Sequence, residues 1–468
     1  MLRHWFGRLI GTALLCFAAS AQAQNWDDVE RPNARALYER IISFDTSTGP
    51  QNVAMANFLA QQFRAGGFAA EDVHIIAAND TAGLLVRYRG DGSVARPILL
   101  IAHMDVVPAL RSEWERDPFT LVEENGFFFG RGASDNKAGV THLVQTLLSL
   151  REDGFTPSRD IFLWLSGDEE TTGATTTTLL SEHRALIGDP EYALNADAGG
   201  GQLMPDGNVI YALQTAEKTY ASFTFTARNE GGHSSVPRAD NAIYALASAL
   251  ERLRAFQFPV QWNETTIASF RIAGEQDGSP AGRAARRFAA NPGDRTAART
   301  MSANPFYSSL MRTTCVATML GGGHAENALP QTATATVNCR IFPGVAVADV
   351  LAELRAVAGD GVEVAQLGPS NASDASPLRG DITAAVERAV AASFREPVIT
   401  PFMSAGATDG LYFRAAGIPT YGVGGLVSGN EDDFAHGLNE RISVDSFYAG
   451  LPHWRALVTE LAGRPAGP

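Results

Sequence analysis

The segment Ile161-Phe162-Leu163-Trp164-Leu165-Ser166-Gly167-Asp168-Glu169-Glu170 places three consecutive acidic residues just after a continuous apolar run. The run Ile161 to Leu165 is typical of a strand that is buried on both faces of a parallel sheet. Because an unpaired buried carboxylate is costly, the acidic residues must either face water or hold a cation. Taken alone, the segment fits a solvated acidic loop as well as a metal site.

Three other predicted strand or turn ends carry side chains of the same chemical kind. The apolar run Ile98 to Ala102 leads into His103, and the carboxylate of Asp105 is close enough in sequence to orient that imidazole. A Gly-rich turn over residues 130–137 carries Asp135 and precedes a predicted helix.

The third such place is Asp197, which follows the short apolar strand Tyr192 to Ala196. In open α/β sheets, ligands bind outside the carboxyl ends of the strands. One rim of the sheet is therefore expected to gather His103, Asp135, Glu170 and Asp197.

The first half of the chain alternates between helical and strand patterns, which predicts an α/β fold with a mostly parallel sheet covered on both faces. The expected helices are Ala34 to Ile42, Val53 to Ala65 and Ala138 to Leu150; the expected strands are Gly83 to Tyr88, Ile98 to Ala102, Ile161 to Leu165 and Tyr192 to Ala196.

From about Glu217 the pattern changes to one typical of an α+β insertion, which we expect to span residues 217–364 between two parts of a catalytic domain, 24–216 and 365–468. The insertion should contain strands Tyr220 to Ala227, Thr313 to Leu320 and Thr332 to Ile341, and helices Asn241 to Leu253 and Val347 to Ala358. Strand Val398 to Phe402 and helix Val444 to Leu461 follow it.

Two cysteines, Cys315 and Cys339, lie on neighbouring predicted strands of the insertion. A hairpin folded about Asn327 would set them opposite each other, so a disulfide is expected. A slip of one residue in register would point the two side chains to different faces and leave two reduced thiols.

Residues 1–23 read as a secretory signal, with Arg3 and Arg8, an apolar run from about Leu9 to Ala19 and a small-x-small site at Ala21-Gln22-Ala23. A retained anchor is the alternative, but the run is shorter than the ~20 residues that span a bilayer. We expect a secreted or periplasmic protein without membrane contact once the signal is removed. The formal net charge of −14 disfavours nucleic acid and anionic lipid as partners.

The motifs, in order, are His-x-Asp at 103–105, Gly-Arg-Gly-x-x-Asp-x-Lys at 130–137, Asp-Glu-Glu at 168–170, Asp-x-Gly-Gly at 197–200 and a late His436. This set resembles the M20 family of dinuclear zinc peptidases and aminoacylases, from about Asn33 to about Leu457. The long segment 264–310, with Arg312-Thr313-Thr314 and Asn327-Ala328-Leu329-Pro330, is most similar to the branch of carboxypeptidase S and secreted N-acyl amino acid hydrolases.

The resemblance implies two Zn²⁺ ions per chain, with Co²⁺ or Mn²⁺ as possible substitutes, and zinc favours imidazole nitrogen and carboxylate oxygen. Carried over motif by motif, it makes Asp135 the bridging ligand, assigns His103 and Asp197 to one ion, and assigns Glu170 and His436 to the other.

By the same resemblance, Asp105 accepts the second ring N–H of His103, and Glu169 is the general base that passes a proton from water to the leaving amine. From the residues alone, Glu169 and Glu170 could exchange these roles.

The resemblance also suggests residues that touch the substrate. His233 would stabilise the tetrahedral oxyanion across the interface of a homodimer, Arg340 would bind the substrate carboxylate, and Asn327 and Thr408 would line the pocket. Simpler readings are an exposed strand arginine for Arg340 and an ordinary turn residue for Thr408.

The expected function is hydrolysis of the amide next to a free C-terminal carboxylate, in a peptide or an N-acyl amino acid. One alternative is a small-metabolite deacylase of the acetylornithine or succinyl-diaminopimelate type, which the signal segment disfavours. The other is a non-catalytic metal-binding protein on the same fold, which the presence of Glu169 beside a full set of ligands disfavours.

Overall fold

A computed structural model describes residues 26–94, 96–429 and 434–463; the predicted signal, residues 1–23, lies outside them. Its centre is a ten-stranded sheet in the order β1-β2-β6-β3-β7-β17-β9-β8-β18, with β16 also paired to β9. The strands are β1 Val73–Ala78, β2 Thr81–Tyr88, β3 Ile98–His103, β6 Ile161–Ser166, β7 Ala193–Asn195, β8 Gly200–Leu203, β9 Val209–Glu217, β16 Val398–Ser404, β17 Thr420–Gly422 and β18 Val427–Ser428.

The parallel pairs are β6–β3, β3–β7, β7–β17, β9–β16 and β8–β18. The antiparallel pairs are β1–β2, β2–β6, β8–β9 and β9–β17. The α/β class with a mostly parallel sheet is thus confirmed. Strand β9, which the sequence analysis did not predict, is the junction between the two halves of this sheet.

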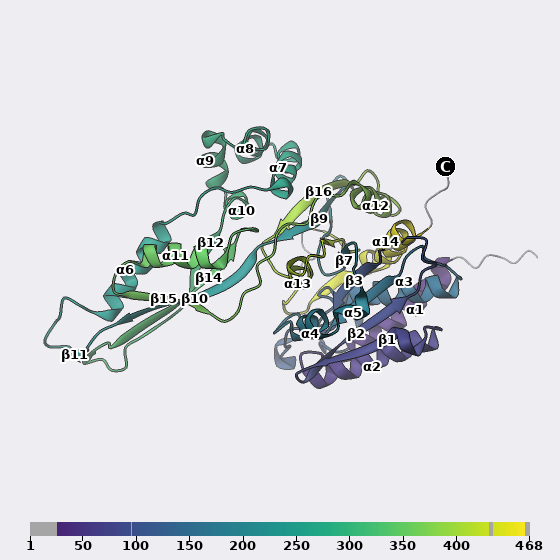
Figure 1. Ribbon diagram of the computed structural model, residues 1–468, viewed down its shortest axis with the longest axis horizontal. Coiled ribbons are helices and arrows are strands. Elements are labelled where there is room, and N and C mark those ends of the chain that lie inside the picture. Colours follow the sequence, from purple (N-terminus) through teal and green to yellow (C-terminus); the bar gives the residue numbers. More distant parts are fainter. Residues whose placement is uncertain (1–25, 95, 430–433, 464–468) are drawn as a thin grey trace, which may run out of the picture.

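Helices cover both faces of the sheet, which explains why its central strands are apolar without alternation (Figure 1). Leu100 and Leu163 face a layer formed by α1 Trp26–Ile42, α2 Gly49–Ala65, α3 Lys137–Glu152, α12 Gly380–Ala391 and α14 Val444–Ala462. Ile101 and Trp164 face α4 Ala174–Glu182, α5 Arg184–Ile187 and α13 Gly410–Ala415.

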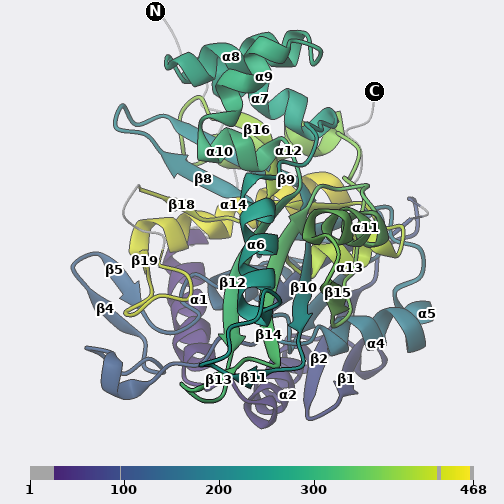
Figure 2. The same cartoon turned by 90° about the vertical axis from the view of Figure 1, so that its left-hand side faces the viewer.

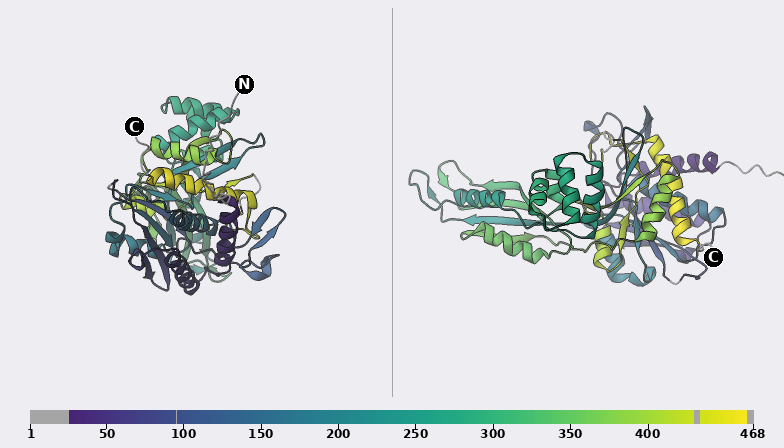
Figure 3. Two further views of the ribbon diagram at one scale, coloured as in Figure 1. Left: turned by 90° about the vertical axis from the view of Figure 1, so that its right-hand side faces the viewer. Right: turned by 90° about the horizontal axis from the view of Figure 1, so that it is seen from above.

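A second sheet, antiparallel throughout, has the order β12-β14-β10-β15, with β10 Thr219–Arg228, β12 Thr314–Gly322, β14 Thr332–Ile341 and β15 Val362–Leu367. It shares a hydrophobic core with α6 Ala242–Ala255 and α11 Val347–Ala358. We call this sheet with its two helices the lid. Only Lys218 separates β9 from β10, and the lid projects away from the central sheet (Figure 1; Figure 3, right).

The two cysteines of the lid face each other in register on β12 and β14 and form a disulfide. The expected disulfide is therefore confirmed, and with it the register of the hairpin. At the far end of the lid (Figure 1), β11 Gly232–His233 pairs with β13 Ala328–Leu329 (Figure 2); we call this pair and the residues that adjoin it the lid tip.

Residues 264–310 form four short helices, α7 Glu264–Gln276, α8 Pro280–Ala290, α9 Arg295–Ser302 and α10 Pro305–Leu310, which we call the four-helix segment. Each helix begins after a side chain that accepts hydrogen bonds from its first turn: Asn263, Ser279, Asp294 and Asn304. Phe270, Phe288 and Met301 give the segment a core of its own, to which Met403 of β16 contributes. The segment therefore lies over β16 and β9 (Figure 2).

The remaining elements are a three-stranded sheet, β19-β5-β4, and two short 3₁₀ turns. Their bounds are β4 Val122–Glu124, β5 Phe127–Phe129, β19 Arg441–Ser443, η1 Ala70–Asp72 and η2 Arg111–Glu113. Within the ranges that the structure describes, no helix is both long and apolar enough to cross a bilayer.

Candidate active site

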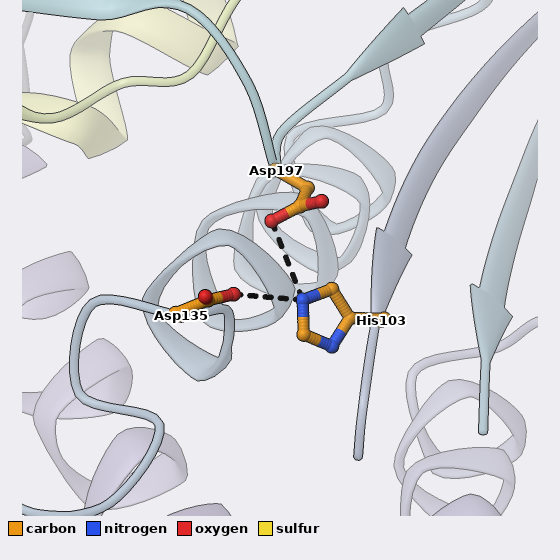
Figure 4. A group of neighbouring side chains, drawn as sticks. All are labelled: His103, Asp135 and Asp197. Carbon is orange, nitrogen blue, oxygen red and sulfur yellow. Dashed lines mark hydrogen bonds and ion pairs between the residues drawn. The ribbon is translucent and has the colours of Figure 1, made fainter. Parts of the chain in front are cut away.

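The candidate site lies at the carboxyl ends of β3, β6 and β7. His103 is the last residue of β3, Glu170 follows β6 closely, and Asp197 comes two residues after β7. Asp135 comes from the turn before α3, and His436 from the segment before β19. Figure 4 shows His103, Asp135 and Asp197 pointing toward one another beyond the strand ends.

Two groups of potential metal ligands share Asp135. In the first, His103 Nε2 lies 2.9 Å from Asp135 Oδ1 and 3.3 Å from Asp197 Oδ1. In the second, His436 Nε2 lies 3.1 Å from Asp135 Oδ2 and 2.8 Å from Glu170 Oε1. Each oxygen of Asp135 therefore faces a different histidine, as a carboxylate that bridges two cations would require.

The charges of the site fit divalent cations. Burial raises the pKa of Asp197 to about 7, and it also raises the pKa of Glu169 and of Glu170. Hydrogen bonding to Asp135 raises the pKa of His436 to about 9. Burial thus disfavours the charged form of these carboxylates, and two cations held by nitrogen and oxygen donors would stabilise that charge.

The carboxylate of Asp105 fixes the turn that carries both glutamates. Its two oxygens accept hydrogen bonds from the backbone N–H groups of Glu169, at 3.1 Å, and Glu170, at 2.9 Å. The nearest acceptor for His103 Nδ1 is the backbone carbonyl of Asp105, at 3.0 Å, whereas the carboxylate lies at 3.5 Å. Asp105 thus connects the histidine to the glutamates, and its main chain orients the ring more closely than its side chain does.

A model of peptidase family M20/M25/M40 matches residues 99–460. The chain is a member of the M20 family. The N-fatty-acyl-amino acid synthase/hydrolase PM20D1 of Xenopus tropicalis is 30% identical over 373 residues, which cover 77% of this chain and 72% of that protein. Carboxypeptidase S of Saccharomyces cerevisiae is 30% identical over 283 residues, covering 57% of this chain and 49% of that protein.

The M20 family metallo-carboxypeptidase Sso-CP2 of Sulfolobus solfataricus has the same fold, with a TM-score of 0.69 at 18% identity over 91% of this chain and 98% of that one. The resemblance drawn from the motifs is confirmed at the level of the family, the fold and these relatives. The chain is a hydrolase of the M20 type.

Glu440 is a residue of this M20 site that the sequence analysis missed. Its buried carboxylate pairs with Arg131 at 2.6 Å and accepts hydrogen bonds from the backbone N–H groups of Gly132, Ser134 and Asp135, at 2.8 to 3.1 Å. It thereby holds the turn that presents Asp135. Its position four residues after His436 was the only signal in the sequence, and one acidic residue in a polar stretch is not distinctive.

The first carboxylate of the Asp-Glu-Glu motif is used in the structure of the turn. Asp168 accepts hydrogen bonds from the backbone N–H groups of Ala174, at 2.6 Å, and Thr175, at 2.9 Å, at the start of α4. A carboxylate at a helix N-terminus satisfies donors that have no partner within the helix. Within this motif, only the carboxylates of Glu169 and Glu170 are therefore available to the candidate metal site.

Thr408 lies in the buried junction between the catalytic sheet and the lid. Its hydroxyl donates to Glu217 Oε1 at 2.6 Å and accepts from Asn195 Nδ2 at 3.0 Å, while Glu217 is also paired with Arg414 at 3.1 Å. This network secures the point where β9 continues into the lid. Thr408, which was expected to line the substrate pocket, is therefore part of the junction between the two sheets.

Arg340 lies on β14 at the base of the lid. Its Nη1 donates to the carbonyl of Ala405 at 2.9 Å, and its guanidinium stacks on the ring of Tyr220, 4.9 Å from the centroid. His233 and Asn327 lie instead at the exposed lid tip, where Ser234 N donates to the Asn327 carbonyl at 3.0 Å. Within one chain the lid end that carries β11 lies away from β3 and β7, whose carboxyl ends carry the ligands (Figure 1).

Proposed function

We propose that this M20 hydrolase is a dinuclear zinc enzyme that cleaves the amide bond next to a free C-terminal carboxylate. The observation that carries the proposal is the placement of Asp135, whose two oxygens face His103 and His436 separately at 2.9 and 3.1 Å. His103 and Asp197 would hold one ion, and Glu170 and His436 the other, with Co²⁺ or Mn²⁺ as possible substitutes. When bound, the ions supply a Lewis acid that polarises the scissile carbonyl.

Glu169 would act as general base and then as general acid, taking a proton from the attacking water and delivering it to the leaving nitrogen. Its side chain is half-buried beside the ligands but belongs to neither ligand group. A carboxylate whose pKa is raised by burial is better matched to proton transfer near neutral pH than an ordinary one. Asp105 would hold this carboxylate in place through the backbone of the turn.

Recognition of the substrate carboxylate is assigned to Arg340. A guanidinium can bind a carboxylate through two parallel hydrogen bonds, and the contacts with Ala405 and Tyr220 restrict its orientation. Thr408 would contribute to the substrate pocket through the buried loop that it anchors.

The functional unit would be a homodimer in which His233 and Asn327 of one lid tip complete the site of the other chain, with His233 stabilising the oxyanion. Two features support a partner of this kind. Both residues are exposed and distant from their own site, and β12 is an edge strand of the lid sheet. Val316, Met319 and Leu320 on β12 are 60 to 74% exposed, so pairing with a second copy would cover both its backbone and its apolar side chains.

Export from the cytoplasm is proposed from two observations. The amino-terminal segment has the composition of a secretory signal, and the lid contains a disulfide, a bond that persists in oxidising compartments. The protein would therefore act outside the cytoplasm, in the periplasm or medium.

The test is a single substrate panel given to purified protein loaded with zinc. N-acyl amino acids and blocked dipeptides should be hydrolysed, the corresponding amides without a free carboxylate should not, and elemental analysis should give close to two zinc ions per chain. Full activity with at most one metal per chain would overturn the bridged site. Equal hydrolysis of the carboxyl-blocked amides would overturn the assignment of Arg340.

A further inference from the structure

A cavity of about 730 Å³ lies where the four-helix segment joins the lid. Its walls come from the connection between α6 and α7, from α9, and from Arg312, which lies two residues before β12. The described residues that line it include none of the metal ligands and neither Arg340 nor Thr408. Because α9 also lies away from β3 and β7 (Figure 1), a ligand of this cavity would be bound outside the candidate active site.

Arg312 places a buried cation in the wall of this cavity. It is 6% exposed, and its guanidinium donates to two neutral groups, Gln257 Oε1 at 2.8 Å and Ser302 Oγ at 2.5 Å. Among the described residues, its Nε–H has no hydrogen-bond partner and its charge has no carboxylate partner. A buried charge without an opposite charge is costly, because its lost hydration is not replaced. Arg312 therefore offers an anion both a donor and an unbalanced positive charge.

Two further arginines line the same cavity, Arg295 and Arg299, which lie one turn apart on α9. Asp294, next to Arg295 in the sequence, pairs instead with Arg287 at 2.6 Å and caps the start of α9. No aspartate or glutamate is found among the described residues of the lining. In a chain whose formal net charge is −14, this local group of three positive charges would attract anions.

The unbalanced positive charge extends to the joint between the two sheets. The buried Lys218, which alone separates β9 from β10, donates from Nζ to the carbonyl of Arg312 at 2.7 Å. Burial, followed by the charges of Arg340 and Arg312, lowers the pKa of Lys218 to about 8. An anion beside Arg312 would reduce this repulsion, so the charges of the joint favour its binding.

An apolar surface adjoins the arginines. Trp262 lines the cavity and is 47% exposed, while its ring packs edge-on against Phe288 with centroids 5.9 Å apart. Val260 and Ala298 are half-buried in the same lining. An indole held in this way provides a surface on which the apolar part of a ligand can pack. The cavity therefore suits an organic anion better than a bare inorganic ion.

We propose that this cavity binds a small phosphate monoester, with its phosphate on Arg312, Arg295 and Arg299 and its organic part against Trp262. Guanidinium groups bind phosphate through paired hydrogen bonds. Three positive charges match the nearly double negative charge of a phosphate monoester better than the single charge of a carboxylate. The inference is independent of the proposed function, because neither the metal ligands nor Glu169 takes part in it.

The first experiment titrates the zinc-loaded protein with phenyl phosphate by calorimetry. Because zinc ions also bind phosphate, the comparison is made between variants that share the same metal site. The double variant Arg295→Gln/Arg299→Gln should weaken binding about tenfold, the usual effect of losing a hydrogen bond to a charged group. The control Arg271→Gln/Arg286→Gln removes two exposed arginines of α7 and α8 outside the cavity and should leave the affinity unchanged. No loss in the first double variant, or an equal loss in both, would overturn the inference.

The second experiment compares phenyl phosphate, inorganic phosphate and benzoate on wild-type and Trp262→Leu protein. Phenyl phosphate should bind the wild type roughly tenfold more tightly than either other probe, and Trp262→Leu should reduce its affinity to that of inorganic phosphate. Benzoate that binds as tightly as phenyl phosphate, or an unchanged affinity in Trp262→Leu, would overturn the inference. Every variant keeps the buried Arg312, so the test does not depend on a substitution there. If the protein hydrolyses no amide while these differences hold, the proposed function fails and the phosphate site stands.

Discussion

Glu169 is predicted to be needed for proton transfer and not for metal binding. Glu169→Gln should keep two zinc ions and the folded structure, because the side chain is outside both ligand groups. It should lower kcat by about 10²- to 10⁴-fold, the usual contribution of general acid–base catalysis. Steady-state kinetics paired with elemental analysis would check this. Loss of zinc from the variant would mean that Glu169 and Glu170 have the opposite roles.

His436 is predicted to make zinc binding depend on pH. Without metal its pKa is raised to about 9 by the hydrogen bond to Asp135 and by Glu170, so at neutral pH the ring carries a proton that zinc must displace. Affinity at this position should therefore rise from pH 7 toward pH 9, by up to about tenfold per unit, and then level off. Competition titrations with a chelator at several pH values would measure it. Affinity that does not change over this interval would contradict the prediction.

Glu440 is predicted to be the most sensitive residue outside the ligands. Glu440→Gln would leave Arg131 buried without its charge partner and would loosen the turn that holds Asp135. The free energy of unfolding should fall by about 3 to 5 kcal/mol, as is typical when one member of a buried pair is removed. Urea denaturation would measure this loss.

Glu460→Gln is the matched control, because Glu460 pairs with Arg388 on the surface. Such exposed pairs contribute about 0 to 1 kcal/mol. Equal stability losses in the two variants would show that the burial of Glu440 has no special effect.

At the scale of elements, the disulfide of the lid is predicted to stabilise the lid without affecting the metal cluster. Replacing Cys315 and Cys339 with alanine opens a connection between residues 24 positions apart, which should cost about 3.5 kcal/mol by the chain-entropy estimate. Calorimetry should show a lower melting temperature for the lid with unchanged zinc content. An identical melting curve before and after reduction of the wild-type protein would contradict this.

Helices and strands whose apolar residues follow one clear period could be predicted from the sequence, whereas those with a mixed pattern of apolar and polar residues could not. The bounds of β14 and α11 agree with the prediction, because each follows a single apolar period. Strand β9 was missed because Thr215 and Gln214 are buried beside its apolar residues, so its pattern is neither alternating nor continuous. The four-helix segment was predicted only as an insertion, although its Asn and Ser caps followed by Pro are helix-start signals.

The ligand residues and their division into two groups that share Asp135 could be predicted from the motifs, but the contacts that support these ligands could not. Motif order was enough to select His103, Asp135, Glu170, Asp197 and His436, which the structure brings together. Sequence spacing could not show that Glu440 supports Asp135, because the two lie 305 positions apart and meet only through the tertiary fold.

At the scale of the whole molecule, the proposed site shared between two subunits predicts recovery of activity between two inactive chains. His233→Ala and Glu169→Gln should each be inactive alone. When subunits exchange, a mixed dimer would contain one site with an intact Glu169 and a donated intact His233, so activity should return. The mixture should be assayed after exchange has been demonstrated with differently tagged chains. Exchange without recovery, or full activity in a strictly monomeric protein, would rule out the shared site.

The last helix, α14, also has a consequence for the order in which the chain folds. It packs against α3 and α12, and the carbonyl of Phe447 accepts a hydrogen bond from His142 Nε2 at 2.8 Å, across 305 positions of sequence. The first half of the protein therefore cannot complete its core until α14, at residues 444–462, has left the ribosome. A nascent chain that stays unfinished for so long remains competent to thread through a translocation channel, and a chain truncated before Val444 should remain sensitive to proteases.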